Sequence, residues 1–386
     1  MTTLAGTATN PPRLENLPPR SLSPARHLIE SSVAEGLRTT TAWGLPLRYA
    51  TADPLAEDRR HVLYRTAARG ERIRIRPGVF VDREEWNSSY PRERHLASAL
   101  ATSITAREPP QFCRETALLF YGLPLDEVPE EITRRALSSG ASGYRSTAQP
   151  EASLWPLLAE RRIAVPAGWT ALPGVVRQDQ EQLIDGRNTC LVEDLRHCLA
   201  DTLPRLGLDS AVMVADAMLS GLRSTHDGGL CVQAPPWSRD QLAAVSLMCR
   251  SQKAARKFTW LAEFADAGAA SPGESLSRLR IHELGFEAPV LQHRVRGADG
   301  RSLGFLDFWW AGIRVAGEFD GWKKYTDADS YSGVDRDLVF RQEKRRTERI
   351  QEEGIRFVRW MWEDLRTPER LATKLAKAGV PRSAVR

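Results

Sequence analysis

Residues 304–310 (GFLDFWW) and 314–321 (RVAGEFDG) are the stretch of sequence that decides the fold of the C-terminal part of the chain. Both segments are apolar runs of strand length, and the carboxylates of Asp307, Glu318 and Asp320 stand inside or directly after them. A carboxylate inside a β-strand is costly to bury unless a partner compensates its charge. The two runs therefore predict neighbouring strands with a divalent metal ion between their carboxylates.

A tight turn at residues 311–312 aligns the two predicted strands. With this turn, Asp307 and Glu318 lie side by side and reach the same ion. Asp320 shares the face of Glu318, because side chains alternate along a strand. Mg²⁺ prefers oxygen ligands and keeps several of its waters, so two or three carboxylates suffice to hold it. Glu274, one turn into a preceding helix, is expected to add a further oxygen.

A bound Mg²⁺ ion neutralises a phosphate and lowers the pKa of a bound water, so phosphodiester hydrolysis is the first hypothesis. Such a site also needs a cation near the attacking water. Lys324, just beyond the acidic strand, and Lys344, in the following helix, are the two candidates. Arg345 and Arg346 are predicted to contact phosphate or to lie on the surface.

Each carboxylate also has a purely structural explanation. Asp307 could cap a turn, and Asp320 could belong to an ordinary turn. Glu274 could be only the third residue of a capping box that begins at Ser271. The occurrence of all three in these strand and helix contexts favours the metal site, and the structural alternatives stay open.

The remaining C-terminal pattern predicts helices and strands in the order α-β-β-β-α-β-α. Pro272 suits the first turn of the first helix, and Gly285 and Gly379 are placed to end the first and last helices. The predicted elements are a helix over 272–284, strands over 290–295 and within 304–319, a helix over 339–353, a strand over 355–360 and a helix over 368–378.

The segment 271–378 resembles the PD-(D/E)XK nuclease superfamily, and within it the small domains related to very-short-patch-repair endonucleases. The matching residues are Glu274 in PGES, Asp307 in LDF and Glu318 in EFDG, followed by EKRR at 343–346 and FVRW at 357–360. The resemblance implies an α/β core with a mixed central sheet and one or two Mg²⁺ ions. It also implies Asp307 and Glu318 as metal ligands, with Glu274 accessory.

The chain departs from the superfamily pattern at one position. That pattern has a lysine two residues after the second acid, and this sequence has Asp320 there. A lysine displaced to Lys324 or Lys344 could replace it. If neither reaches the site, the domain binds DNA without cutting it.

Composition and charge bound the protein class. At 386 residues the chain is expected to hold two or three domains, and 42% hydrophobic residues suffice for packed cores. The net charge of +5 is compatible with a nucleic-acid partner. Five scattered cysteines without paired spacing argue against a zinc or redox site and predict free thiols in a reducing cytoplasm. No apolar run reaches the ~18 residues of a membrane helix, and no signal peptide is read.

A basic hairpin over 71–81 (ERIRIRPGVFV) is the second signal. Period-two alternation places its isoleucines on one face and Arg72, Arg74 and Arg76 on the other. A predicted helix over 56–69 precedes the hairpin, and a helix followed by an arginine-edged hairpin is the shape of a winged helix. The arginines would give salt-dependent affinity for phosphates. The helix would enter the major groove with Arg59, Arg60, His61 or Arg65.

The alternative is that these arginines form a solvated strand face. In that case they pair with Glu71, Asp82 or Glu84, and the hairpin has no ligand.

Residues 40–135 also resemble the winged-helix N-terminal part of AbiEi-type antitoxins. The matching stretches are RIRPGVFV at 74–81 and ETALLFYGLP at 115–124, with looser matches at 191–196 and 214–217. The resemblance implies DNA binding and transcriptional autoregulation in a toxin–antitoxin or phage-defence setting, with a cognate toxin as partner.

Taken together, the sequence predicts a multidomain protein of mixed α+β and α/β class. The expected order is a disordered leader over 1–25, a winged-helix region over 26–135, a mixed α/β middle over 136–267 with helical spacing at 191–199 and 210–222, and a restriction-endonuclease-like core over 268–386. The expected function is Mg²⁺-dependent hydrolysis of double-stranded DNA in the cytoplasm, with no membrane partner. The alternatives are a non-cleaving regulator and an interaction module for a toxin.

Overall fold

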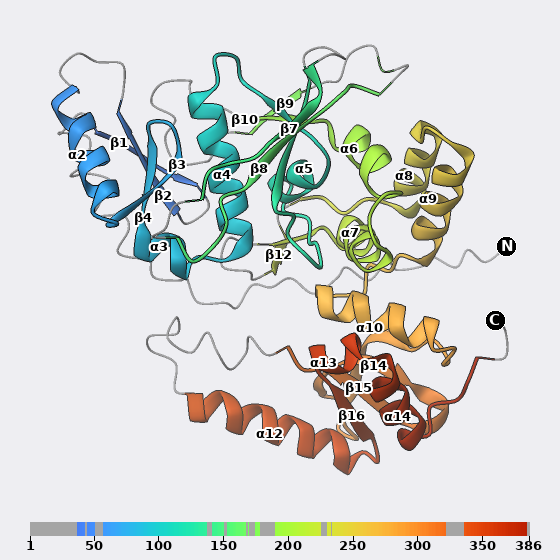
Figure 1. Ribbon diagram of the computed structural model, residues 1–386. Coiled ribbons are helices and arrows are strands. Elements are labelled where there is room, and N and C mark those ends of the chain that lie inside the picture. Colours follow the sequence, from blue (N-terminus) through green and yellow to red (C-terminus); the bar gives the residue numbers. More distant parts are fainter. Residues whose placement is uncertain are drawn as a thin grey trace, which may run out of the picture.

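The computed structural model is a mixed α/β protein (Figure 1). The structure describes residues 37–42, 45–50, 57–136, 141–149, 153–166, 169, 174–177, 190–224, 230–232, 234–321 and 336–383. The leader predicted over 1–25 lies outside these residues, and so does Lys324.

Four antiparallel strands form the N-terminal sheet, in the order β1-β2-β4-β3. The predicted helix and basic hairpin are found as α2, β3 and β4. Gly70, with a φ of 73°, follows α2 in the left-handed conformation that glycine adopts without strain. The elements are β1 (Leu37–Ala42), β2 (Leu45–Ala50), α2 (Glu57–Ala68), β3 (Arg72–Arg76), β4 (Val79–Asp82), α3 (Arg83–Ser88) and α4 (Pro91–Thr105).

A six-stranded mixed sheet, ordered β7-β8-β6-β5-β10-β9, forms the middle region. β6 runs parallel to β8, and β5 runs parallel to β10. The strands are β5 (Gln111–Phe112), β6 (Glu131–Arg135), β7 (Gly143–Arg145), β8 (Ala159–Ile163), β9 (Gly174–Arg177) and β10 (Cys190–Glu193), with a separate hairpin of β11 (Leu222–Ser224) and β12 (Leu230–Val232). The helices are α5 (Arg114–Phe120), α6 (Leu195–Thr202), α7 (Leu208–Ser220), α8 (Arg239–Ala244), η4 (Val245–Met248) and α9 (Gln252–Phe264).

The helical spacing predicted over 191–199 is correct only for its second half. Residues 191–193 belong to β10, which pairs with β5 on one side and β9 on the other. Cys190 and Val192 are buried in that strand. A short apolar run does not distinguish a buried strand from a helix, and pairing with two distant strands decides it here.

The C-terminal part has the predicted order of elements, with a short helix α13 added. Its sheet is ordered β13-β14-β15-β16, in which the first three strands are antiparallel and β16 is parallel to β15. The elements are α10 (Pro272–Glu283), β13 (Val290–Arg296), β14 (Ser302–Trp310), η5 (Ala311–Ile313), β15 (Val315–Phe319), α12 (Arg336–Glu352), β16 (Arg356–Trp360), α13 (Trp362–Arg366) and α14 (Pro368–Ala378).

Helices cover both faces of this C-terminal sheet. Phe308 and Trp310 belong to the core cluster that includes Leu276 of α10. Trp309, which points to the opposite face, belongs to a second cluster with Ile350 of α12. The result is a helix, sheet, helix layering that presents one strand face to each helix.

Helix α10 connects this layered part to the middle region, as Figure 1 shows. Arg278 of α10 donates to both carboxylate oxygens of Asp216 on α7, at 3.0 and 2.8 Å. Asp216 is almost fully buried, so its charge requires this partner. A further ion pair joins Arg280 of α10 to Asp209 of α7.

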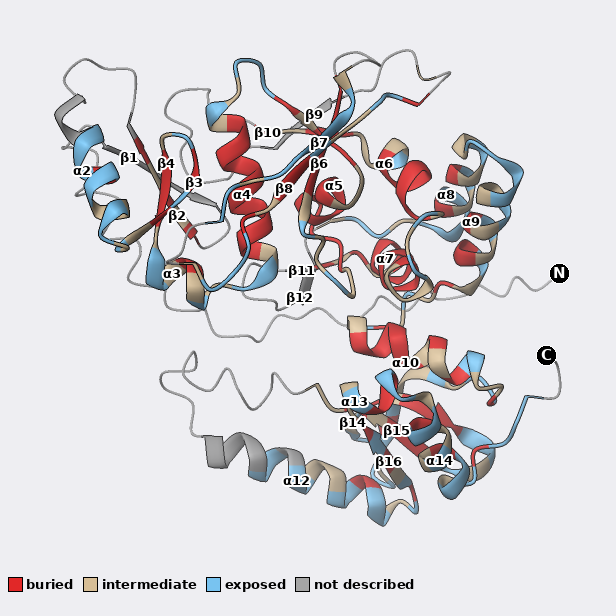
Figure 2. Cartoon of the chain, viewed as in Figure 1, coloured by how far each residue is buried: buried red, intermediate tan, exposed pale blue. Residues whose placement is uncertain are grey.

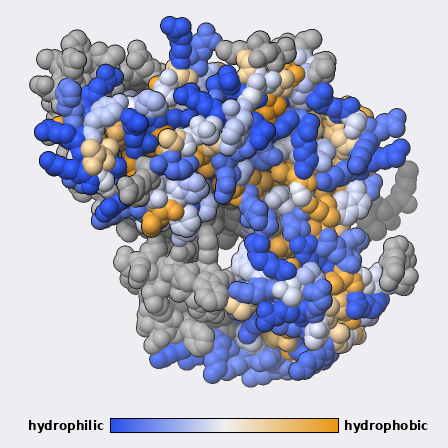
Figure 3. Space-filling view, viewed as in Figure 1, coloured by the Kyte–Doolittle hydropathy of each residue, from blue (hydrophilic) through white to orange (hydrophobic). Residues whose placement is uncertain are grey.

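Burial follows the same layers. Helices α4, α5 and α7 are largely buried, whereas the described parts of α2 and α12 are mostly exposed (Figure 2). The face seen in Figure 3 carries mainly hydrophilic residues, with smaller apolar patches. Among the described residues, no helix combines the length and apolarity that crossing a membrane requires.

Candidate functional site

A row of polar side chains crosses all four strands of the C-terminal sheet. The register pairs Phe308 with Gly317, which sets Asp307 of β14 beside Glu318 of β15. Glu318 in turn pairs with Arg359 of β16. On the other side of Asp307 lies Gln292 of β13. The alignment of Asp307 with Glu318 expected from the turn at residues 311–312 is therefore correct.

Glu318 lies between two arginines. Arg359 Nε donates to its Oε2 at 2.8 Å, and Arg346 Nη1 of α12 lies 3.4 Å from its Oε1. The Glu318 side chain is 13% exposed, so these ion pairs are only partly screened by water. Both carboxylate oxygens thus have a cationic partner within the protein.

Asp307 is half-buried and contacts the neighbouring strand. Its Oδ2 accepts a hydrogen bond from the backbone N–H of Phe319 at 3.2 Å. This contact holds the carboxylate against β15, next to Glu318.

Glu274 combines a capping role with a contact to the strand row. Ser271 Oγ accepts from the Glu274 backbone N–H at 3.2 Å and donates to Glu274 Oε1 at 2.9 Å. Its Oε2 accepts from the backbone N–H of Ala270 at 2.9 Å and from Gln292 Nε2 at 3.0 Å. Burial, and after it the negative charge of Asp307, raises the pKa of Glu274 to about 7. Glu274 therefore takes part in the cap of α10, as the structural alternative predicted, and also lies near Asp307.

The first turn of α10 is seated directly on β15. The ring of Phe319 occupies the place where a side chain of Gly273 would begin, since a Cβ there would lie 2.0 Å from Phe319 Cε1. The absence of a side chain at Gly273 lets α10 approach the sheet, and Glu274 is the next residue.

The candidate cations are arranged differently from the sequence expectation. Lys344 is exposed on α12, and its ammonium lies 3.9 Å from Glu348 Oε1, one turn along the same helix. Arg346, assigned to phosphate or the surface, is the α12 residue that reaches Glu318. Its guanidinium also donates to Phe305 O and lies across Gly304, where a Cβ would be 2.5 Å from Arg346 Nε.

Asp320 and Arg345 are two further residues of the predicted site. Asp320 directly follows β15, and its backbone N–H donates to Trp360 O at 2.9 Å, which extends the pairing of β15 with β16. Arg345 is exposed on α12.

The donor chemistry of this cluster fits Mg²⁺ in part. Glu274 and Asp307 supply carboxylate oxygens from two elements, and Mg²⁺ prefers such oxygens. Glu318, by contrast, is balanced by Arg346 and Arg359. Among the residues that the structure describes, no three His, Cys, Asp or Glu side chains form a group arranged to hold a metal ion. Glu274 and Asp307 are thus the residues that would hold Mg²⁺.

The basic hairpin does not present its three predicted arginines on one face. Arg72 donates to Asp82 at 2.9 Å, as the solvated-face alternative foresaw. Arg74 is exposed, with its guanidinium 5.9 Å from the centre of the Tyr64 ring. Arg76 is buried, so the prediction that it lies on the outward face is wrong.

A β-bulge in β3 explains why Arg76 is buried. Arg74 pairs with Phe80 and Arg76 pairs with Val79, so Ile75 is an extra residue on its strand. An extra residue breaks the alternation of side chains between the two faces. The bulge therefore turns Arg76 inward.

The preceding helix presents part of the predicted groove-reading set. Arg60, His61 and Arg65 are exposed on α2. The side chain of Arg59 lies outside the described residues.

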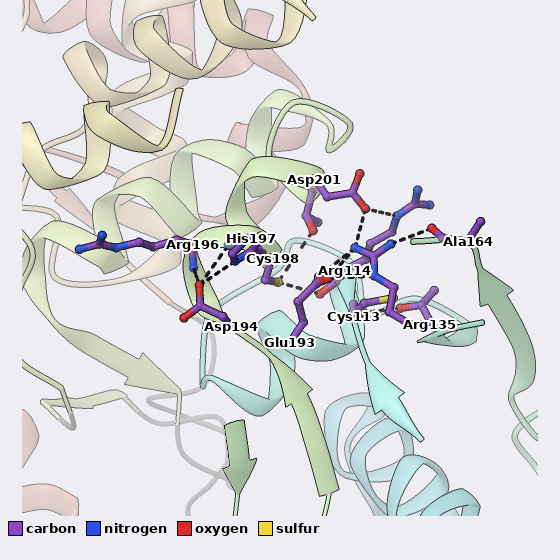
Figure 4. A network of polar contacts seen from close by, with 12 residues as sticks. Cys113, Arg114, Arg135, Ala164, Glu193, Asp194, Arg196, His197, Cys198 and Asp201 are labelled. Carbon is purple, nitrogen blue, oxygen red and sulfur yellow. Dashed lines mark hydrogen bonds and ion pairs between the residues drawn. The ribbon is translucent and has the colours of Figure 1, made fainter. Parts of the chain in front are cut away.

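A buried ionic network occupies the middle region (Figure 4). Arg135 donates to both oxygens of Glu193, at 2.8 and 3.0 Å, and to Asp201 Oδ2 at 3.1 Å. Arg114 Nε donates to the same Asp201 oxygen at 3.0 Å. Burial raises the pKa of the Cys113 thiol beside this network. The network joins β6, β10, α5 and α6, and its protein partners account for its charges.

Sequence reasoning missed two members of the strand row, Gln292 and Arg359. Gln292 has a φ of 47°, a conformation that is uncommon for a residue other than glycine. No local sequence signal announces that backbone geometry. Arg359 lay within the recognised FVRW motif, and its position opposite Glu318 follows once β16 is placed parallel to β15.

No family model, curated protein or solved structure matches this chain.

Proposed function

We propose that the protein acts on DNA and that its C-terminal part is a nuclease-like unit that hydrolyses phosphodiester bonds with Mg²⁺. The observation that carries the proposal is the proximity of the Glu274 and Asp307 carboxyl groups, from α10 and β14, with Glu318 of β15 beside Asp307 in the strand register. The element order and the mixed sheet agree with the nuclease resemblance.

Each residue of the cluster has a distinct part in this proposal. Glu274 and Asp307 hold the ion, which would neutralise a phosphate and lower the pKa of a bound water. Glu318 orients Arg346 and Arg359, and these guanidiniums are placed to contact a phosphodiester. Gln292 fixes the position of the Glu274 carboxylate. In the N-terminal part, Arg60, Arg65 and Arg74 are the exposed residues proposed to contact duplex DNA.

A plasmid-nicking assay with Mg²⁺, Mn²⁺ or EDTA tests the proposal. Asp307→Asn should lower the cleavage rate by at least about 100-fold. Loss of a residue that only hydrogen-bonds to a metal ligand typically costs roughly 10–100-fold, so a larger loss indicates a direct ligand. Duplex binding should persist, because the amide retains the shape of the side chain. Asp299→Asn is the matched control, since Asp299 is an exposed carboxylate in a turn of the same unit. Equal cleavage by Asp307→Asn and wild type would reject the site.

A second candidate is a non-cleaving transcriptional regulator of the antitoxin type. Two observations favour this candidate. Arginines pair with both carboxylate oxygens of Glu318. Asp320 also stands at the position where the superfamily has a lysine. In the same assay this candidate gives salt-sensitive binding to the protein's own promoter and no cleavage with either metal. The toxin partner implied by the resemblance would then be sought by co-purification.

A further inference from the structure

A cavity of about 410 Å³ lies between the basic hairpin and the middle sheet. Its wall is formed by residues of α2, the β3–β4 turn, the end of α4 and strands β6, β7 and β8. The volume falls within the roughly 300–1,000 Å³ typical of small-molecule sites. None of the carboxylates of the C-terminal strand row lines it.

The charges that line this cavity are unequal. Arg60, Arg76, Arg134 and Arg145 contribute four guanidinium groups, and Glu160 contributes the one carboxylate of the lining. Glu160 Oε1 accepts from Arg134 Nε at 2.8 Å, and its Oε2 lies 3.8 Å from Arg76 Nη2. One carboxylate cannot balance four cations, so the wall has an excess of positive charge.

Arg76 makes this imbalance costly. Its side chain is 8% exposed, and its buried Nη2 has no hydrogen-bond acceptor among the described residues. Burial lowers the pKa of Arg76, and Arg145 and Arg134 lower it further against the opposing effect of Glu160. A buried donor without an acceptor carries the full penalty of its lost hydration. A bound anion would offset the excess positive charge around this guanidinium.

We propose that this cavity binds a small molecule bearing one or more phosphate groups. Guanidinium groups match phosphate oxygens with paired N–H donors, and several arginines around one pocket suit a multiply charged anion. Arg76 lines the cavity with only 8% of its side chain exposed, which suits a small anion better than the backbone of a duplex. The proposal does not rest on the nuclease function, although Arg60 also belongs to the surface proposed to contact DNA.

Calorimetric titration of the full chain with pyrophosphate and with ATP, at constant ionic strength, tests this proposal. Both probes should bind to the wild-type protein. Arg145→Gln should weaken each of them by about tenfold or more, the effect of one lost charged hydrogen bond. Arg145 is exposed on β7, so this variant does not disturb the core. Arg76→Lys keeps the charge but loses the paired donors, and it should also bind more weakly.

Arg161→Gln is the matched control. Arg161 follows Glu160 on β8, its side chain points to the other face of the strand, and it pairs with Glu131 outside the cavity. This variant should bind both probes as the wild type does. Absence of binding by the wild type, or an equal loss in Arg161→Gln and Arg145→Gln, would overturn the proposal.

Discussion

Two charged clusters of this protein differ in how their charges are balanced. In the C-terminal row, Glu318 has a guanidinium on each carboxylate oxygen. In the cavity beside the basic hairpin, one carboxylate faces four guanidiniums. The charge of Glu318 is thus already balanced by its own partners, whereas the cavity retains an excess of positive charge. A metal ion would have to compete with arginines for Glu318, while an anion entering the cavity displaces no carboxylate from its partner.

The largest expected effect comes from Glu160→Gln, which removes the carboxylate of the cavity. Glu160 is almost fully buried, and its loss leaves Arg76 and Arg134 without their charge partner. Breaking a buried ion pair from one side costs about 3–5 kcal/mol. Urea unfolding should show this loss, and added pyrophosphate should recover part of it by binding to the unbalanced arginines.

Glu131→Gln is the control for this comparison. Glu131 also pairs with an arginine on β8, but both side chains are partly exposed. Its loss should cost less than about 1 kcal/mol. Equal losses of stability in Glu160→Gln and Glu131→Gln would show that the buried pair in the cavity is no more stabilising than the exposed pair.

The next effect is a pH dependence carried by His95 on α4. Burial lowers the pKa of His95 from 6.5 to about 4. The unfolded chain therefore takes up the proton first, and stability falls as pH drops from about 6.5 to 4. The contribution is about 3 kcal/mol over this range. Urea unfolding measured across that pH range should show a smaller loss of stability on acidification for His95→Gln than for the wild type.

As a control, the exposed His61→Gln variant should lose stability on acidification as the wild type does.

Glu274, in the C-terminal row, should give the opposite pH dependence, because burial raises the pKa of its carboxyl group. Its contribution falls as pH rises from 4.5 to about 7. Hydrogen exchange should therefore show α4 opening more readily, and α10 less readily, as the solution is acidified. Parallel changes in both helices would contradict the assignment.

A smaller effect is expected for Glu318→Gln. Its partners Arg346 and Arg359 are 24% and 46% exposed, so water replaces much of the lost attraction. The expected cost is about 1–2 kcal/mol in urea unfolding, below that of Glu160→Gln. A cost above that of Glu160→Gln would reverse the comparison between the two clusters.

The smallest effect is expected for Lys344→Gln. Lys344 forms an exposed pair with Glu348 one turn along α12, and such pairs contribute about 0.3–0.5 kcal/mol. Thermal unfolding at low and high salt should show little difference from wild type. A large loss of DNA cleavage in this variant would restore Lys344 as the active-site cation.

The C-terminal layout was predictable from the sequence because it depends on local patterns. Ser271 and Pro272 mark the start of α10, and the short turn after β14 sets Asp307 beside Glu318. The identity of the cations around Glu318 was not predictable. Arg346 and Arg359 arrive from a later helix and a parallel strand, and only the assembled sheet brings them to the carboxylate.

The N-terminal hairpin shows the opposite outcome from an equally clear pattern. Its alternation of arginine and isoleucine predicted one basic face, and a single extra residue at Ile75 placed Arg76 in the interior. A bulge depends on how a strand pairs with its neighbour, which alternation alone does not reveal. Arg76 thereby lines a cavity that sequence reasoning did not anticipate.

The contact between Gly273 and Phe319 has a consequence for how this protein tolerates change. Gly273 precedes Glu274, and Phe319 follows Glu318, so the thickness of one aromatic ring sets the spacing between the elements that carry the two carboxylates. Even the methyl group of alanine at position 273 would have to move the helix or the ring. Accepted substitutions at these two positions should therefore occur together, as compensating pairs rather than one at a time.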